Sequence, residues 1–343
     1  MQSIYDFTRH DLQQRFSPKF RADQIYTWLY KKYADTFAEM TDLSDALRAE
    51  LEEDYDFCPL TLDIKQVSID GSEKWRFRTF DNEYIETALV LMKEAEEGSS
   101  AEWTICVSSQ IGCKIGCAFC ATGKQGFVRN LSAGEIVSQV LLAKKLKSIK
   151  ATKGVNVVFM GMGEPLDTLI DVIKSIKIMT DEKGLGLSPK RITVSTSGIA
   201  GKIESLANAN LGINLAISLH AVDNTTRDIL VPLNKAYNIE TILEAVRHFP
   251  SDARKKTLFE YLLLDGINDD EKSAKTLAKL LNGIDAKVNL INFNSHSNSE
   301  FRRSSEENVK KFAKILQDKG IICTTRASRG ADIDAACGQL RHQ

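Results

Sequence analysis

Residues 132–162 read SAGEIVSQVLLAKKLKSIKATKGVNVVFMGM and join a helical pattern to an apolar strand pattern. Ser132 and Glu135 have the spacing of a capping box, which predicts that a helix begins at this point. Strand and helix patterns alternate in this way as far as residue 327. The candidate strands span residues 103–109, 156–162, 191–197, 214–220, 256–264, 287–293 and, more weakly, 321–327.

Repeated β-α units of this length imply a parallel sheet, and six or more of them fit an α/β fold with a full or partial (β/α) barrel. An open doubly wound sheet is the competing architecture. Polar residues follow the candidate strands at their carboxyl ends, which all face one end of such a barrel. These residues are Glu164, Ser195, Ser218, His220 and Asn294.

The chain divides into three predicted parts. Residues 1–59 are a helical N-terminal accessory domain, with one helix over residues 21–33 and a second over 44–55 that Ser44 caps. Residues 60–98 are a β-meander and a loop, and 99–343 are the barrel with a C-terminal cysteine tail. The meander strands are residues 62–69, 72–80 and 83–92, separated by Asp70-Gly71 and Asp81-Asn82, and residues 93–102 are expected to be an exposed loop.

Composition excludes several classes of protein. The 343 residues carry a net charge of -1, so an RNA site would have to be a local basic patch. No apolar run approaches the ~20 residues of a membrane span, and Met1 begins no signal peptide, so we expect a cytoplasmic protein without membrane contact. Seven cysteines are an odd number in a large chain, which favours metal ligands or catalytic thiols over a disulfide framework.

Three of these cysteines, Cys113, Cys117 and Cys120, form the pattern C-x3-C-x2-C. A structural zinc ion would need a fourth ligand, and the next cysteine downstream is Cys323. A redox C-x-x-C pair would leave Cys113 unexplained. A cubane iron–sulfur cluster held by three thiolates leaves one iron open, which accounts for the missing fourth thiol.

The pattern C-x3-C-x-aromatic-C, with Phe119 as the aromatic, resembles the radical S-adenosylmethionine superfamily. Its wider context resembles one branch, the RlmN/Cfr family of adenosine methyltransferases that act on 23S rRNA and, in the RlmN branch, on tRNA. The resemblance extends from about Phe20 to Leu340. The stretches that carry it are CVSSQIGCKIGCAFCATGKQGFVRNLSAGEI (106–136), FMGMGEPL (159–166), STSGI (195–199), ISLHA (217–221) and GADIDAACGQL (330–340).

The resemblance implies a radical-SAM barrel with one 4Fe–4S cluster on Cys113, Cys117 and Cys120. It also implies that S-adenosylmethionine, two molecules per turnover, contacts a set of residues at the strand ends. The family's prolines after the last asparagine are missing from NFNSHSNSEF (292–301). The matching residues for S-adenosylmethionine are Gly163, Glu164, Ser195, Ser218, Leu219, His220 and Asn294.

The family reaction assigns roles to three further residues. Cys337 carries a methyl group and becomes bonded to the adenine, Glu86 accepts a proton, and Cys106 resolves the protein–RNA adduct. A Cys106–Cys337 disulfide results, which a reductant must reopen. The implied activity is methylation of adenosine carbon 2 in 23S rRNA and tRNA by a monomer that receives electrons from a flavodoxin-like or ferredoxin-like donor. The alternatives are methylation at carbon 8, or a non-catalytic iron–sulfur or zinc RNA-binding module.

Other residues have plainer interpretations. From the sequence alone Glu86 would face solvent, His220 would be an ordinary strand-end histidine, and Cys106 would belong to the core. Cys58 and Cys323 are expected in the core, because reduced cysteine buries like a hydrophobic residue. Lysine-rich residues 143–153 and 247–256 are expected to be solvated helix faces. The candidates for contact with RNA, unless the segment is only a lid, are Arg9, Arg15, Lys19, Arg21, Lys31 and Lys32.

Overall fold

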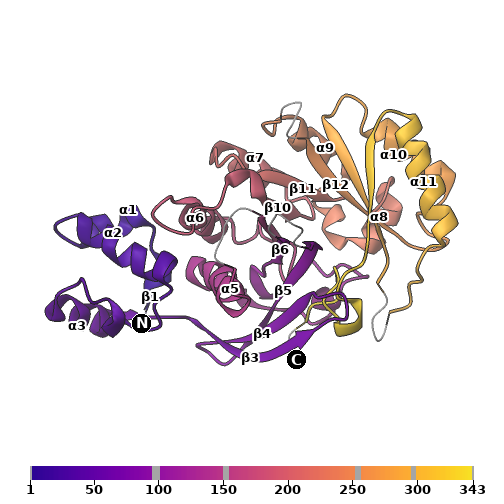
Figure 1. Cartoon of the computed structure of the whole chain (residues 1–343). Helices are drawn as coiled ribbons and strands as arrows, with labels where there is room; N and C mark the ends of the chain where they lie inside the picture. The colour runs from indigo at the N-terminus through magenta and orange to yellow at the C-terminus, as the bar shows by residue number, and fades with distance from the viewer. Residues whose placement is uncertain (1, 95–100, 150–153, 252–255, 295–298, 342–343) are drawn as a thin grey trace.

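A computed structural model describes residues 2–94, 101–149, 154–251, 256–294 and 299–341. Within these residues ten strands form one sheet, and seven of them are parallel and follow one another in chain order (Figure 1). The parallel strands are β6 (Glu102–Cys106), β9 (Val155–Phe159), β10 (Ile192–Thr196), β11 (Asn214–Ser218), β12 (Thr257–Leu263), β13 (Ala286–Asn292) and β14 (Ile322–Arg326).

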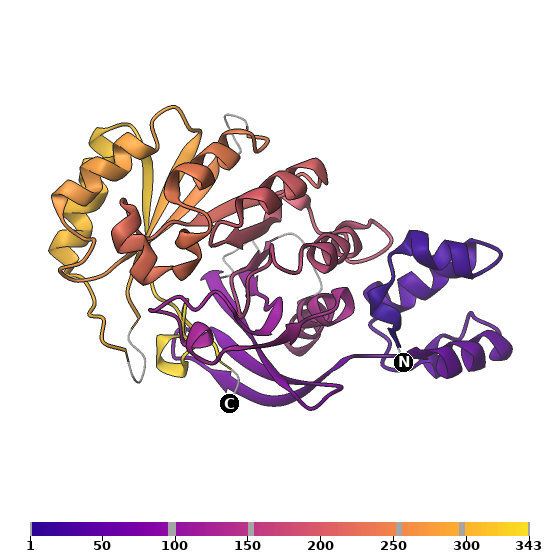
Figure 2. The same ribbon diagram turned by 180° about the vertical axis from the view of Figure 1, so that it is seen from behind.

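The strand order confirms the predicted barrel and excludes the doubly wound alternative. A doubly wound sheet reverses its order at a switch point, whereas these parallel strands never reverse. In the described sheet β14 is an edge strand, so the barrel is partial. The helices that connect the parallel strands cover the outside of the sheet (Figures 1 and 2). They are α5 (Ala133–Leu146), α6 (Leu169–Thr180), α7 (Ala200–Asn208), α8 (Asn224–Leu230), α9 (Ile239–Arg247), α10 (Glu271–Leu280) and α11 (Glu306–Asp318).

The predicted meander is confirmed as β3 (Leu60–Val67), β4 (Glu73–Thr79) and β5 (Tyr84–Lys93). It is not a separate layer, because β5 pairs antiparallel with β6 and so continues the barrel sheet. The predicted loop over residues 93–102 falls mostly on residues 95–100, which lie outside the described part of the chain.

The N-terminal domain lies against α5 and α6 at one side of the barrel (Figures 1 and 2). The predicted helix over 44–55 is confirmed, with the Ser44 side chain accepting a hydrogen bond from Leu47 N. The predicted helix over 21–33 ends as a π-helical turn instead of a continuous α-helix. The elements are β1 (Gln2–Ser3) paired with β2 (Tyr55–Asp56), α1 (Arg9–Arg15), α2 (Phe20–Thr27), the π-turn Trp28–Lys32, α3 (Asp45–Asp54), and 3-10 turns at Ile4–Asp6 and Phe37–Glu39.

Several polar contacts attach this domain to the barrel, and two of them show how. The Asp6 carboxylate accepts a hydrogen bond of 2.6 Å from Gly134 N, at the first turn of α5. A side chain at position 134 would bring its Cβ within 2.8 Å of that carboxylate, which explains the glycine. Arg9 donates to Asp181 at 2.9 Å, just after α6. The domain is therefore fixed to both helices that follow the first barrel strands.

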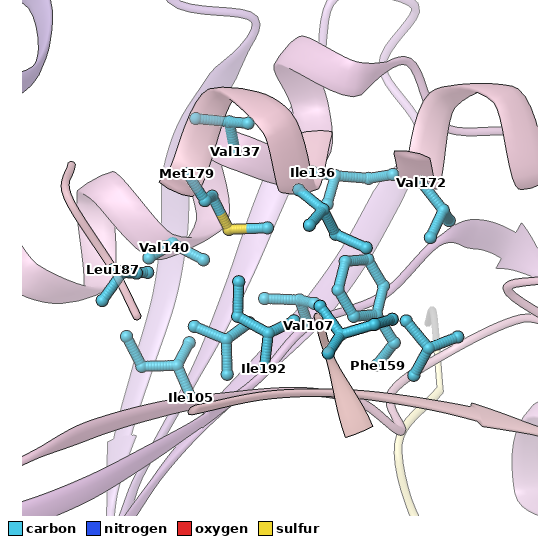
Figure 3. Packing of buried hydrophobic residues seen from close by; sticks show 14 of the residues in the cluster. Ile105, Val107, Ile136, Val137, Val140, Phe159, Val172, Met179, Leu187 and Ile192 are labelled. Carbon is cyan, nitrogen blue, oxygen red and sulfur yellow. The ribbon is translucent and has the colours of Figure 1, made fainter. Parts of the chain in front are cut away.

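The core between helices and sheet is shown in Figure 3. Ile136 and Val137 of α5 and Met179 of α6 point toward Ile105 and Ile192 on the strands, and none of the five side chains is exposed. Burying each aliphatic side chain stabilises the folded protein by about 1.5–3 kcal/mol. This layer therefore holds in place the strands that lead to the predicted site.

The remaining cysteine and lysine predictions have mixed outcomes. Cys323 is buried as predicted, whereas Cys58 is exposed, so the core prediction for Cys58 is wrong. Lys144 is buried at the end of α5, although its neighbours Lys145 and Lys147 face solvent wholly or in part. Residues 150–153 and 252–255 of the two lysine-rich stretches lie outside the described residues. No helix in the described ranges is long and apolar enough to cross a membrane.

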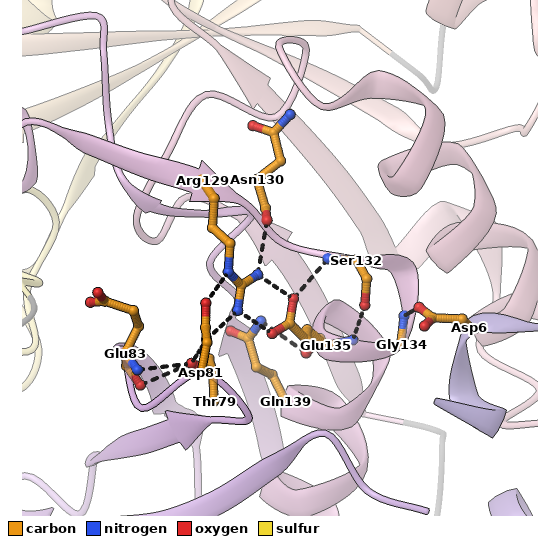
Figure 4. Close-up of polar contacts among 10 residues, drawn as sticks. All are labelled: Asp6, Thr79, Asp81, Glu83, Arg129, Asn130, Ser132, Gly134, Glu135 and Gln139. Carbon is orange, nitrogen blue, oxygen red and sulfur yellow. Dashed lines mark hydrogen bonds and ion pairs between the residues drawn. The ribbon is translucent and has the colours of Figure 1, made fainter. Parts of the chain in front are cut away.

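The capping box that opens α5 is confirmed and belongs to a larger ionic network (Figure 4). Ser132 and Glu135 exchange hydrogen bonds at 2.9 and 3.2 Å. Arg129 contacts both Glu135 oxygens at 2.8 Å and both Asp81 oxygens at 2.7 and 2.8 Å. Arg129 thereby joins the β4–β5 turn to the start of α5, and it lowers the pKa of Asp81 to about 2.

We expect Arg129→Met to destabilise the protein by about 2–4 kcal/mol, because the buried Glu135 loses its partner while Arg129 itself is partly exposed. Urea unfolding monitored by circular dichroism measures this. The part of this stabilisation that comes from Asp81 is fully present at pH values above the ordinary pKa of an aspartate, near 4. It should disappear as the pH falls toward about 2, the pKa of Asp81 in the folded protein.

The matched control is Arg247→Met, which removes an exposed pair with Glu244 and should cost less than about 1 kcal/mol. Equal losses in the two variants would contradict the structural role of Arg129.

Candidate active site

The three motif cysteines lie in a loop between two short strands, β7 (Gln110–Gly112) and β8 (Phe127–Asn130), that pair outside the main sheet. Gly112 has a φ of 72°, and a Cβ there would lie 2.0 Å from the Gly126 carbonyl oxygen. Glycine at position 112 is therefore required for the strands to close the loop. The short helix α4 (Ala121–Lys124) follows the last cysteine.

The loop faces a cavity of about 140 Å³ at the carboxyl ends of the parallel strands. Most residues predicted for the cluster and for S-adenosylmethionine line it, together with Cys337, although they come from five separate segments. The predicted residues in its lining are Cys113, Cys117, Cys120, Gly163, Glu164, Ser195, Ser218, His220 and Cys337.

Two predicted contacts lie elsewhere. Leu219 is fully buried, and its N–H donates to the Glu260 carbonyl at 3.1 Å. Asn294 lines a neighbouring cavity, and its amide nitrogen donates to the Cys337 carbonyl at 3.5 Å. Asn294 therefore contacts the cysteine tail.

The three motif thiols can bind a metal cluster once they lose their protons. Burial raises the pKa of Cys113 to about 12, and burial followed by the charges of Cys120 and Cys113 raises the pKa of Cys117. Metal binding must displace these protons. Among the described residues no three acidic, histidine or cysteine side chains converge on one ion position. Three thiolates can each bind a different iron of a cubane, whereas a structural zinc ion takes four protein ligands, so the chemistry of the three motif thiols fits a 4Fe–4S cluster.

Glu164 is held rigidly at the cavity wall. Its carboxylate accepts hydrogen bonds from Ser197 N at 2.8 Å and Leu166 N at 3.0 Å. Gly163 before it has a φ of 100°, and a Cβ there would lie 2.5 Å from Gln110. The motif GMGEP is thus explained by close packing of its backbone against β7.

His220 is a neutral acceptor in this structure. Its Nδ1 accepts a hydrogen bond of 3.1 Å from Leu262 N, and burial followed by the charge of Arg227 lowers its pKa to about 3. The ring lies edge-on to Phe119, 4.9 Å between centroids. The aromatic residue of the cysteine motif thus packs against the fourth parallel strand's end.

Cys106 and Cys337 line a second cavity together, and Cys337 lines both cavities. Both thiols are free in this structure, so they are not joined by a disulfide. Burial and the nearby Cys337 raise the pKa of Cys106 to about 12. The thiols are 231 positions apart in sequence, yet they lie in the same cavity, as the resemblance implied.

Glu86 is buried, so the solvent-facing interpretation is wrong. Its carboxylate accepts 2.9 Å contacts from the Lys74 ammonium and from Arg341 N, and it lies outside the described linings of the two cavities. In this state Glu86 anchors the end of the chain.

Two important residues escaped prediction. Arg227 on α8 is fully buried and donates to the carbonyls of Leu219 at 2.9 Å, Ser197 at 2.6 Å and Ser218 at 3.1 Å. Arg227 therefore connects the carboxyl ends of β10 and β11. The sequence did not predict this role, because an arginine on an amphipathic helix does not indicate such contacts. Glu260 did carry a signal, since it is the one acidic residue within the apolar stretch KTLFEYLLL.

The chain is similar to known proteins along its whole length. The model of the radical SAM superfamily matches residues 107–278, and the ribosomal RNA large subunit methyltransferase N-terminal domain matches residues 2–56. The chain is 54% identical to the dual-specificity RNA methyltransferase RlmN of Wolinella succinogenes, over 100% of this chain and 97% of that protein. It is 52% identical to RlmN of Campylobacter jejuni, over 99% and 98%.

One solved structure has the same fold throughout. The crystal structure of a radical SAM methyltransferase from Sphaerobacter thermophilus covers 99% of both chains, with a TM-score of 0.92 and 40% identity.

We expect Cys113→Ala, Cys117→Ala and Cys120→Ala each to abolish the visible absorption of the anaerobically reconstituted protein, because each change removes one of three thiolate ligands. Iron and sulfide analysis quantifies the loss. Cys58→Ala is the control, since that cysteine is exposed and outside both cavities, and it should keep the cluster. Stoichiometric zinc without iron in the wild-type protein would contradict the assignment of these cysteines to an iron–sulfur cluster.

Proposed function

This chain belongs to the RlmN family of dual-specificity RNA methyltransferases within the radical SAM superfamily, and we propose that it methylates carbon 2 of adenosine in 23S rRNA and in tRNA. The observation that carries the proposal is the position of Cys337. It lines one cavity with the three motif cysteines and a second cavity with Cys106. A thiol that must first receive a methyl group and later be released from the base needs access to both the motif cysteines and Cys106.

A 4Fe–4S cluster on Cys113, Cys117 and Cys120, when bound with S-adenosylmethionine, supplies a carbon-centred radical. A radical route suits carbon 2 because this electron-poor carbon cannot attack a methyl group as a ring nitrogen can. We assign S-adenosylmethionine contacts to Gly163, Glu164, Ser195, Ser218 and His220, which line the same cavity as the motif thiols. Leu219 and Asn294 would act through their neighbours, Leu219 by placing the strand end and Asn294 by holding the tail.

Cys337 is the proposed methyl carrier, and its sulfur becomes bonded through that carbon to adenine. Cys106 then attacks the Cys337 sulfur as a thiolate, the sulfur–carbon bond breaks with its electron pair staying on the departing carbon, and that carbon takes up a proton to become the methyl group. The products are the methylated base and a Cys106–Cys337 disulfide, which an external reductant reopens. The positive charge of Arg326 opposes the effect of burial on the pKa of both thiols and so favours the thiolate.

Glu86 is the proposed proton acceptor. Its support is a buried carboxylate on β5, two positions before Ala88, which pairs with Cys106. Because Glu86 now contacts Lys74 and Arg341 N, this role requires the C-terminal tail to move during the reaction.

The RlmN names of the relatives favour carbon 2 over carbon 8, and membership of a methyltransferase family disfavours the non-catalytic module. We further propose a cytoplasmic monomer that uses two S-adenosylmethionine molecules per turnover and a flavodoxin-like or ferredoxin-like electron donor. The assignment of residues 1–59 as an RNA-binding domain, 60–98 as an extension and 99–343 as the catalytic core is part of the same proposal. The family match over residues 2–56 supports its first boundary.

The basic residues of the N-terminal domain differ in availability. Arg9 pairs with Asp23 and Asp181, and Arg15 lies over the Phe7 ring at 4.3 Å. Lys32 pairs with Asp42, and the Arg21 side chain is half-buried. Lys19 and Lys31 are exposed, so we propose that these two contact RNA phosphates.

We expect the thiol variants to separate adduct formation from resolution. Cys106→Ala should accumulate a covalent protein–RNA species that survives denaturation, whereas Cys337→Ala and the double variant should form none. Denaturing gels with labelled RNA measure the adduct, and Glu86→Ala should also accumulate it if proton removal precedes release. An adduct in Cys337→Ala, or normal turnover in Cys106→Ala, would overturn these roles.

We expect Lys19→Ala/Lys31→Ala to lower the slope of log affinity against log salt by about 2, since each lysine neutralises one phosphate. Fluorescence anisotropy with an unmodified tRNA transcript measures this. Lys275→Ala/Lys314→Ala on α10 and α11 is the matched control and should keep the wild-type slope. An unchanged slope in the first variant would place RNA recognition elsewhere.

A further inference from the structure

Glu260 is a buried carboxylate that the proposed reaction does not yet use. It lies within β12 and is 3% exposed, and it lines the cavity that holds the motif cysteines and Cys337. One of its oxygens, Oε1, is buried and has no hydrogen-bond partner among the described residues. An unpaired buried acceptor of this kind costs about 1–3 kcal/mol, so its retention points to a donor that arrives with a ligand.

The side chain is held in one orientation by its neighbours in the sheet. Asn289 Nδ2 donates to Glu260 Oε2 at 2.9 Å, and Thr324 Oγ1 donates to Asn289 Oδ1 at 3.1 Å. The three residues are direct register partners on β12, β13 and β14. This chain of hydrogen bonds fixes one carboxylate oxygen and leaves the other available.

Glu260 also lines a polar groove along the inner face of the strands, of about 520 Å³. Within the described lining it is the sole acidic residue among five cationic ones. Such a groove attracts phosphates, whereas a carboxylate repels them and accepts only hydrogen-bond donors. Arg326 and Arg329 line both this groove and the cavity of Cys106 and Cys337. The cationic residues are Lys190, Arg191, Lys287, Arg326 and Arg329.

The donors that an RNA base can offer here differ between purines. Adenine has an amine on carbon 6, whereas guanine and hypoxanthine have an oxygen at that position, which a carboxylate repels. Burial raises the pKa of Glu260, and Arg326, Asn289 and Lys287 oppose that rise. In its ionised form the free oxygen can only accept a hydrogen bond.

We propose that Glu260 accepts a hydrogen bond from the exocyclic amine of the target adenine and thereby selects adenine over other purines. The inference rests on the proposed function, since it concerns the base that Cys337 would engage in the same cavity. S-adenosylmethionine also carries amines, and Ser218 is the register partner of Glu260, so the test must distinguish the two sources.

The test is a double-mutant cycle that combines a substitution in the enzyme with a change of the target base in the RNA. Full-length, cluster-loaded protein is given a tRNA transcript with adenosine, purine riboside or inosine at the position where mass spectrometry locates the methyl group. Wild type should prefer adenosine to purine riboside, which lacks the amine, by about 10- to 100-fold in kcat/KM, the effect of one hydrogen bond to a charged group.

In Glu260→Gln this preference should fall toward about 1, and inosine should improve relative to adenosine. Asn289 would hold the amide oxygen, so the new NH₂ group would face the O6 of inosine. Dividing the wild-type ratio by the variant ratio cancels the intrinsic reactivity of each base. Asn289→Leu frees the carboxylate to rotate and should lower the preference as well, which gives a reading that does not depend on folding of the first variant.

Glu73→Gln is the matched control, because Glu73 is a buried carboxylate on β4 paired with Lys65 and Lys147, outside both cavities and the groove. It should keep the wild-type preference. An unchanged preference in Glu260→Gln overturns the inference, and so does a raised KM for S-adenosylmethionine without a change in base preference. A wild-type protein that methylates no RNA overturns the proposed function and the inference together.

Discussion

The architecture of the site depends on how residues 337–340 are held against the cysteine loop. Ala121 N donates to the Gly338 carbonyl at 2.8 Å, and Thr122 Oγ1 donates to the Leu340 carbonyl at 2.6 Å. These bonds place Cys337 at the wall shared by two cavities, although the described residues of the tail form no strand with the barrel. The tail and the loop therefore hold each other in place, and the carboxyl ends of the strands and the thiol of the tail line the same cavity.

The parts outside the parallel strands support that enclosure from one side. The meander extends the sheet beyond β6, and its β5 carries Glu86, which holds Arg341. Arg129 connects the meander turn to α5, and the N-terminal domain attaches through Asp6 to the same helix end. The start of α5 is therefore the point where the meander, the cysteine loop and the accessory domain meet, which explains why its cap is so fully satisfied.

Local patterns could be predicted from the sequence, whereas contacts between distant segments could not. The capping box at Ser132 and the apolar strands depend on near neighbours and were confirmed. Cys58 was misjudged because burial depends on what packs over a residue. Glu86 was misjudged because alternation on a strand does not reveal that Lys74 and Arg341 contact it. Only the family resemblance could bring Cys106 and Cys337 together, and even it gave no sign that Leu219 and Asn294 lie outside the first cavity.

The separate pairing of β7 and β8 has a consequence for how the protein matures. The loop that carries Cys113, Cys117 and Cys120 is closed by its own two strands, and the ten-stranded sheet makes its ladder without them. The scaffold can therefore form before any iron or sulfide arrives, unlike small domains whose metal is their core. Folding of the polypeptide and assembly of its inorganic cofactor need not be synchronised, since the backbone pairing of the sheet uses none of the three motif cysteines.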